Sequence, residues 1–212
     1  DHGFHPQFED PNGKFYTSLD DFEILVSSEP TFTGIGQSVR EEIIRKTSNG
    51  SARYSARFTA EQYAADRQVL YQRVLLPALA VGKTVLQSRS VSTSIVYQPM
   101  QRLQSGEEPL TIEDVVQIPG NQLALKNAPG LLIIPTVPDI DVVIERLAQR
   151  EKKDDCRFEN PEFQRIVKPL YESERLRRIF ESRGCAVELL DASISVDKTR
   201  ELGVELYRKY FE

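Results

Sequence analysis

The chain has 212 residues, a net charge of −5, 40% hydrophobic residues and 28% charged residues. This balance is typical of a globular protein with a real core, and it excludes the broad positive surface that nucleic acids or anionic membranes attract. Two cysteines, Cys156 and Cys185, are too few for a disulfide framework or a zinc site, so we expect free thiols. The apolar runs are too short to span a bilayer and the first residues lack a signal-peptide core, which favours a cytoplasmic protein.

Short apolar runs bounded by Gly, Pro, Ser or Asp predict buried strands. They lack the alternation of a half-exposed strand, which indicates a parallel sheet covered on both faces. The four clear runs are Phe22–Val26, Thr84–Leu86, Leu131–Ile134 and Val187–Leu190, and Lys14–Thr17 is a candidate fifth.

Helical patterns separate these strands. Thr59 is the expected cap of the longest helix, with Glu61 in its first turn. The predicted helices are Gly36–Lys46, Thr59–Ala80, Ile112–Lys126, Asp139–Gln149, Pro161–Arg183 and Val196–Tyr210. Strands that alternate with helices predict a single domain over residues 1–212, built as a three-layer α/β/α sandwich with a parallel sheet.

Two segments suggest where a ligand would bind. Ligands of parallel sheets lie at the carboxyl ends of the strands, and Ser88-Arg89-Ser90 follows such an end. Residues 150–160, REKKDDCRFEN, form a charged break between two helices. That break is either a solvated linker or a small lid whose cations reach phosphates.

Several segments occur together in one order with natural spacing: SEPTFTGIGQSVREEI, QYAADRQVLYQRVLLPALAVGKTVLQSRSVSTSIVYQ, RLAQREKKDDCRFENPEFQRIVKPLY and LLDAS. Together they resemble the thymidylate kinase family of P-loop nucleoside monophosphate kinases, over roughly residues 14–210. The resemblance implies transfer of the terminal phosphoryl group of ATP, with Mg²⁺, onto dTMP to give dTDP. The family is commonly dimeric, which implies a homodimer.

The resemblance also implies roles for the residues of the middle segment. Arg89 would grip the monophosphate, where a guanidinium can make two charge-assisted hydrogen bonds. Tyr63 stands where the family stacks a phenylalanine on thymine, and Arg67, one turn later, would bond the base. The alternative interpretation makes Tyr63 a core residue and pairs Arg67 with Glu61 or Asp66.

Other matching positions complete the expected acceptor site. Ser94 and Gln98 would contact the base or sugar, with Tyr97 between them, and they share one face if a helix starts near Ser92. Glu29-Pro30 corresponds to the Glu-Pro of the family's Arg-Glu-Pro-Gly segment, and the resemblance implies that Pro30 packs near the base. A capping serine and an exposed glutamine are the alternative for Ser94 and Gln98.

Two positions depart from the family pattern, and one segment carries its lid. Ser28 replaces an arginine, and Ser88 replaces an aspartate that normally organises Mg²⁺, so the metal ligands stay unknown. Arg150 and Arg157, in the lid segment about 150–160, are expected to reach the ATP phosphates on closure and to act in catalysis.

The phosphate-binding loop G-x-x-x-x-G-K-[ST] is missing from the sequence. Gly13-Lys14 does not qualify, because Phe8 stands five residues before the glycine and Phe15 follows the lysine. Thr17 to Phe22 is also too short for the crossover that parallel strands need. Either the complete coding sequence carries a segment here that this sequence lacks, or the protein has lost the loop.

Three functions follow as hypotheses. The first is an active thymidylate kinase, and the second is a catalytically impaired relative that binds nucleotide or a protein partner. The third is a kinase for another deoxynucleoside monophosphate, since a tyrosine ring stacks on any base.

Overall fold

The computed structural model describes residues 23–45, 54–101, 110–142, 156, 158 and 160–212. The chain divides into two compact units, residues 1–124 and 125–212, and the division falls within one helix. The candidate strand Lys14–Thr17 and the greater part of the lid segment lie outside the described residues. All described strands pair in parallel, which confirms the predicted α/β class.

The first unit is built around a parallel pair of strands, β1 (Ile24–Ser28) and β2 (Thr84–Ser88). Their register places Ile24 opposite Thr84 and Ser28 opposite Ser88. Burial alternates along β1, where Leu25 is 3% exposed and Val26 is 71% exposed. One face of β1 is therefore covered within the described residues, whereas the sequence predicted cover on both faces.

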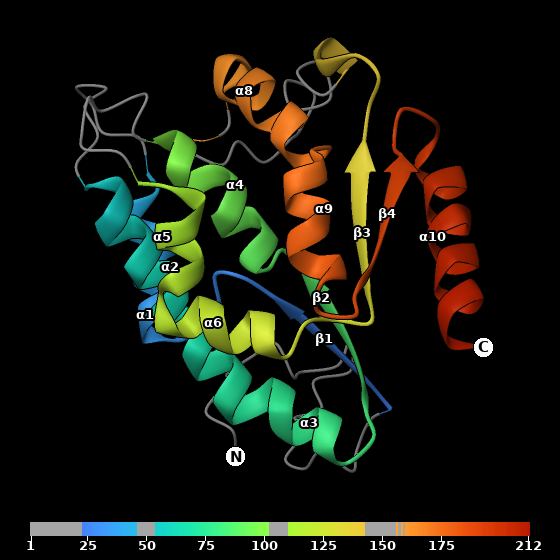
Figure 1. The fold of residues 1–212 in the computed structure, drawn as a ribbon, viewed down its shortest axis with the longest axis horizontal. Helices are drawn as coiled ribbons and strands as arrows, with labels where there is room; N and C mark the ends of the chain where they lie inside the picture. The colour runs from blue at the N-terminus through green and yellow to red at the C-terminus, as the bar shows by residue number, and fades with distance from the viewer. Residues whose placement is uncertain (1–22, 46–53, 102–109, 143–155, 157, 159) are drawn as a thin grey trace. The chain divides into compact units, whose positions relative to one another are not determined.

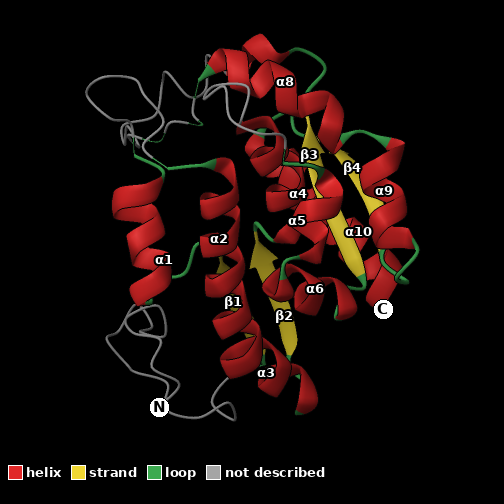
Figure 2. Cartoon of the chain, turned by 60° about the vertical axis from the view of Figure 1, so that its left-hand side comes forward, coloured by secondary structure: helices red, strands yellow, loops and turns green. Residues whose placement is uncertain are grey.

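Helices complete the first unit (Figure 1). They are α1 (Gly34–Ser38), α2 (Ala56–Leu70), α3 (Leu76–Ala80), α4 (Val91–Gln101), α5 (Ile112–Gln117) and α6 (Pro119–Lys126), with π-helical turns at Val39–Ile43 and Tyr71–Leu75. The second π-helical turn joins α2 to α3, and Figure 2 shows this long helix running beside the strand pair.

Two helix boundaries in the first unit differ from the prediction. Ser55, not Thr59, caps α2, because its hydroxyl accepts from the amide of Phe58 at 3.0 Å. Thr59 lies inside the helix, fully buried, and its hydroxyl accepts from Gln101 Nε2 at 3.2 Å. The predicted helix Ile112–Lys126 is broken at Ile118, whose extended backbone is the conformation that a following proline enforces.

The second unit contains the parallel pair β3 (Leu131–Thr136) and β4 (Ala186–Asp191). Its helices are α8 (Pro161–Tyr171), α9 (Glu174–Glu181) and α10 (Val196–Phe211), and α9 and α10 flank the strands in Figure 1. The predicted helix Pro161–Arg183 is divided because Ser173 caps α9, accepting from the amide of Leu176 at 3.2 Å. None of the described helices has the length and apolar character needed to cross a bilayer.

Cysteine reactivity tests the packing of the second unit. Cys185 is 2% exposed, and burial raises the pKa of its thiol to about 11. At pH 8 roughly one such thiol in 1,000 is thiolate, the reactive form. We expect iodoacetamide to label the half-buried Cys156 first and Cys185 only on unfolding or as the pH approaches 11. Mass spectrometry of timed samples measures both rates, and equal rates at pH 8 would contradict the buried placement of Cys185.

Candidate functional site

The segment that follows β1 is fixed by side chains of α2. Asp66, which is 1% exposed, accepts from the amide of Thr31 at 2.7 Å and from its hydroxyl at 2.5 Å. A Cβ placed on Gly36 would overlap the backbone of Thr31, so α1 approaches this segment more closely than any larger residue allows. The Asp66 bonds hold the Glu29-Pro30-Thr31 turn against α2, which also carries Arg67, and α1 packs on the same turn at Thr31.

Arg67 is the centre of a buried polar cluster. Its side chain is 1% exposed and donates to both carboxylate oxygens of Glu29 and to Ser94 Oγ at 3.1 Å. Its Nη1 atom donates to Asn121 Oδ1. Four of the five guanidinium N–H donors are thereby used, which leaves one N–H, on Nη1, without an acceptor among the described residues.

The local pairing considered for Arg67 is wrong. Glu61 pairs instead with Arg57 at 3.4 Å on the exposed side of α2. Asp66 accepts from Thr31, as described above. The true partner, Glu29, lies 38 residues away in the sequence, and it also accepts from Gln87 Nε2 at 2.8 Å.

Burial governs the electrostatics of this cluster. It raises the pKa of Glu29, while the charge and hydrogen bonds of Arg67 oppose the rise. The bidentate contact favours the ionised form of Glu29, because a guanidinium supplies two parallel donors to one carboxylate, and it limits the rise in pKa that burial causes. Burial also raises the pKa of Tyr71 to about 12, and the nearby Glu29 charge adds to that shift.

The residues predicted on α4 lie next to this cluster. The helix begins at Val91, so Ser94 and Gln98 are one turn apart on the same face, as expected. Ser94 is 1% and Gln98 is 2% exposed, which excludes the alternative of an exposed glutamine. Gln98 Oε1 has no hydrogen-bond partner among the described residues. Tyr97, between them, is half-buried.

Tyr63 and Pro30 are both buried. Tyr63 is 7% exposed and belongs to a hydrophobic cluster with Val39 and Ile43. This environment is the one expected if Tyr63 is a core residue. Pro30 follows Glu29 through a cis peptide bond. A stacking role for Tyr63 and a base contact for Pro30 stay predictions.

Arg89 stands apart from the buried cluster, at the carboxyl end of β2. It is exposed, and it is the only non-glycine residue in the described part of the chain with positive φ, at 62°. Left-handed backbone at an arginine is uncommon and gathers at functional sites. Immediately before it, Ser88 faces Ser28 across the sheet, so the two serines that depart from the family pattern are neighbours.

Arg150 and Arg157, the predicted ATP-binding residues, lie outside the described residues. Within the described residues, no group of three His, Cys, Asp or Glu side chains is arranged to hold a metal ion. Serine hydroxyls at positions 28 and 88 are poor ligands for a hard cation. The described ends of β1 and β2 therefore supply no carboxylate for Mg²⁺ at positions 28 and 88, and its ligands stay unknown.

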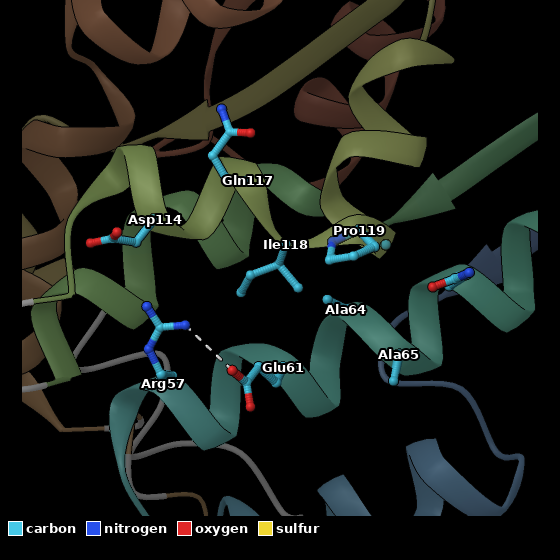
Figure 3. A pocket seen from close by; sticks show the side chains of 10 residues that line it. Arg57, Glu61, Ala64, Ala65, Asp114, Gln117, Ile118 and Pro119 are labelled. Atoms are coloured by element: carbon cyan, nitrogen blue, oxygen red, sulfur yellow. Dashed lines mark hydrogen bonds and ion pairs between the residues drawn. The ribbon is translucent and has the colours of Figure 1, made fainter.

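A groove of about 450 Å³ lies along α2, lined by residues of α2, α5 and the start of α6. Figure 3 shows Ile118 and Pro119 next to Ala64, and the Arg57–Glu61 ion pair along the same helix. None of the predicted site residues lines this groove. It lies instead at the contact between α2 and the start of α6.

Sequence reasoning missed one member of the buried cluster. Asn121 is fully buried and binds Arg67 and the carbonyl of Val115. The sequence carries only a weak signal for it: Pro119-Gly120 predicts a helix start, which would place the next residue in a first turn. Nothing in the sequence shows that this turn meets α2.

Comparisons with known proteins agree on one family. The family model for thymidylate kinase matches residues 14–201. A probable thymidylate kinase of Pyrococcus abyssi is 35% identical over 77 residues, which are 36% of this chain and 38% of the relative. A thymidylate kinase of Caldanaerobacter subterraneus is 29% identical over 198 residues, which are 89% of this chain and 83% of that one.

A solved structure of the thymidylate kinase of Candida albicans has a similar fold. The two structures superpose with a TM-score of 0.63 at 20% sequence identity, and the match covers 89% of this chain and 82% of the Candida albicans chain. The chain spans 38% of the length of the Pyrococcus abyssi relative and 49% of the length of a thymidylate kinase of Clavibacter sepedonicus.

Proposed function

This chain belongs to the thymidylate kinase family, and from that premise we propose that it binds dTMP and phosphorylates it with ATP. The products are dTDP and ADP. One observation supports the proposal most: Gln98 Oε1 is buried without a partner among the described residues, one helical turn from Ser94, which accepts from Arg67. The donor count of Arg67 leaves one further N–H for a ligand. Buried groups of this kind are costly unless a ligand satisfies them.

Thymine has the complementary chemistry. Its Watson–Crick edge presents a carbonyl acceptor beside the N3–H donor, which suits one guanidinium N–H and one amide oxygen. Ser94 Oγ already accepts from Arg67 at 3.1 Å, so its own hydroxyl proton is left to meet a second acceptor on the base or sugar. Pro30 and Tyr63 border the base in this proposal, and Tyr97 contacts the sugar side.

In the proposed reaction, an oxygen of the dTMP phosphate attacks the terminal phosphorus of ATP. A new P–O bond forms as the bond to the β-phosphate oxygen breaks, and ADP leaves. Arg89 holds the attacking phosphate and offsets its charge, which is the main protein contribution in such transfers. Arg150 and Arg157 act on the ATP phosphates from the lid segment about 150–160, as the family pattern implies.

A second function has an observation in its favour. Ser28 and Ser88 are paired neutral residues where the family pattern has an arginine and an aspartate. A chain without those charges would bind dTMP yet transfer phosphate poorly. We hold this impaired relative as the alternative, together with a kinase that accepts a different deoxynucleoside monophosphate.

Release of ADP separates the three functions. A preparation free of contaminating kinases is incubated with ATP, Mg²⁺ and dTMP, dUMP, dCMP or dGMP in turn. Turnover that is fastest with dTMP supports the first function, and turnover that is fastest with another nucleotide supports the third. Binding of dTMP without any ADP release supports the impaired relative and contradicts catalysis.

Substitution of Arg89 tests the phosphate contact. Arg89→Ala should weaken dTMP binding about 10- to 100-fold, the effect of losing hydrogen bonds to a charged group. Thymidine, which lacks the phosphate, should bind the variant and the unchanged chain equally. Lys83→Ala, at the opposite end of β2, is the matched control and should leave both affinities unchanged. Calorimetric titration measures the six affinities of the three proteins for the two ligands, and an equal loss for thymidine in Arg89→Ala would assign Arg89 a structural role only.

The remaining expectations from the family belong to the same proposal. They are a single domain over residues 1–212, a homodimer and a cytoplasmic location. Sedimentation of the purified chain measures the dimer directly.

A further inference from the structure

Asn121 is fixed from two directions. Its Nδ2 donates to the carbonyl of Val115 at 2.7 Å, and its Oδ1 accepts from Arg67 Nη1. The carbonyl can only accept and the guanidinium can only donate, so the two bonds determine which way the amide faces. The side chain is 0% exposed, and no rearrangement toward solvent is open to it.

Gly120 makes this contact geometrically feasible. A Cβ on Gly120 would overlap the carbonyl oxygen of Ala64, so the first turn of α6 touches the backbone of α2 itself. Ala64 lies three residues before Arg67, which is almost one helical turn. The glycine thus brings the next residue, Asn121, level with the guanidinium.

The guanidinium is consequently held at both of its ends. Nε and Nη2 donate to Glu29, Nη2 also donates to Ser94 Oγ, and Nη1 donates to Asn121. With Glu29 as its only contact, the guanidinium plane could rotate together with the carboxylate. The hydrogen bond from Nη1 to Asn121, at the other end of the guanidinium, prevents this rotation. The remaining Nη1 N–H therefore points in one direction before any ligand arrives.

We propose that Asn121 is a positioning residue for nucleobase recognition: it aims the remaining N–H of Arg67 at the base without touching the nucleotide. The inference rests on the proposed function, because it assumes that the base lies against Arg67. It assigns a role to α6, which carries none of the residues expected at the acceptor site. The effect is on base binding and not on phosphate binding, and this separates it from a general structural role.

Two ligands test the inference with the full chain. One is dTMP, and the other is 2-deoxyribose 5-phosphate, which lacks the base. Asn121→Ala should weaken dTMP binding about tenfold, the loss expected for one hydrogen bond to a charged group, and leave the sugar phosphate unchanged. Asn121→Leu fills a similar volume without an acceptor for Arg67, so it should lose dTMP affinity to the same extent as Asn121→Ala.

Val115→Ala is the matched control for loosened packing. Val115 is 0% exposed, and the substitution leaves its backbone carbonyl in place for Asn121. In Val115→Ala, the ratio of the affinity for dTMP to the affinity for 2-deoxyribose 5-phosphate should be the same as in the unchanged chain. A tenfold shift of that ratio in Val115→Ala, or an unchanged ratio in Asn121→Ala, would overturn the positioning role.

A measurement without ligand separates this inference from the proposed function. The Nε–H of Arg67 should give a sharp ¹⁵N-resolved proton signal that exchanges slowly with water. Asn121→Ala should broaden it or speed its exchange, while Val115→Ala should not. If dTMP fails to bind the unchanged chain, the proposed function is wrong, and this signal still decides whether Asn121 fixes Arg67. A slow signal that persists in Asn121→Ala overturns the inference.

Discussion

Arg67→Met is expected to lower the free energy of unfolding by about 3–5 kcal/mol, because it leaves the carboxylate of Glu29 buried without its partner. Both side chains of the pair are at most 2% exposed. Removing one member of such a pair costs more than the pair itself contributes, since desolvation of the remaining charge is no longer offset. Urea unfolding followed by circular dichroism measures the change.

Two further variants show whether the cost comes from the unpaired charge. The double variant Arg67→Met/Glu29→Leu should be more stable than Arg67→Met alone, since it removes the stranded carboxylate. Arg57→Met breaks the exposed pair with Glu61 on the same helix, where the side chains are 62% and 47% exposed. That control should change stability by less than about 1 kcal/mol. A double variant that is less stable than Arg67→Met would contradict the account.

The cost in Arg67→Met should also depend on pH. Burial raises the pKa of Glu29, and Arg67 is the main group that lowers it, so the variant has the larger upward shift. A carboxyl whose folded pKa is raised contributes most stability when protonated, and that contribution is lost as the pH rises through the raised pKa. The variant should therefore be closer in stability to the unchanged chain at pH 5 than at pH 8.

Gly120→Ala is expected to destabilise the chain by about 2–3 kcal/mol, because the new methyl group would overlap the Ala64 carbonyl oxygen. The overlap is with backbone, which cannot turn aside as a long side chain can. Relief requires α6 to move away from α2, and this movement also withdraws Asn121 from Arg67. The variant should consequently lose dTMP affinity together with stability.

Gly203→Ala is the matched control. Gly203 lies inside α10, and a Cβ there meets no atom within 4 Å. Alanine is the better helix former, so this variant should gain about 0.5–1 kcal/mol. Equal stabilities of the two alanine variants would show that α6 does not approach α2 as closely as described.

The sequence located the secondary structure well where local signals are strong. All four clear apolar runs are strands, within two residues at each end, because uninterrupted β-branched and leucine runs have few other uses in a short segment. The breaks at Ile118 and Ser173 were missed although Pro119 and the serine cap are visible in the sequence. In both places the helical spacing of apolar residues continues across the break. That spacing predicts one long helix and outweighs the proline or the serine cap that marks the break.

The candidate site was only half predictable. Ser94 and Gln98 follow from helical spacing, but the partner of Arg67 does not, because Glu29 lies 38 residues away and is brought near only by folding. The local candidates Glu61 and Asp66 lie six residues and one residue before Arg67, and both have other partners, because Glu61 pairs with Arg57 and Asp66 accepts from Thr31. Asn121 depends on the approach of two helices at Gly120, which no pattern in a single sequence reports.

The register of β1 and β2 also determines which charges stand at this edge of the sheet. Ser28 and Ser88 are opposite one another on adjacent strands, which are about 4.8 Å apart. With serine at both positions the two strands end in a neutral pair. The charges at this edge are therefore those of the next residues along each strand, Glu29 and Arg89, and Glu29 is buried while Arg89 is exposed. A ligand that approaches the strand ends from solvent consequently meets a cation first.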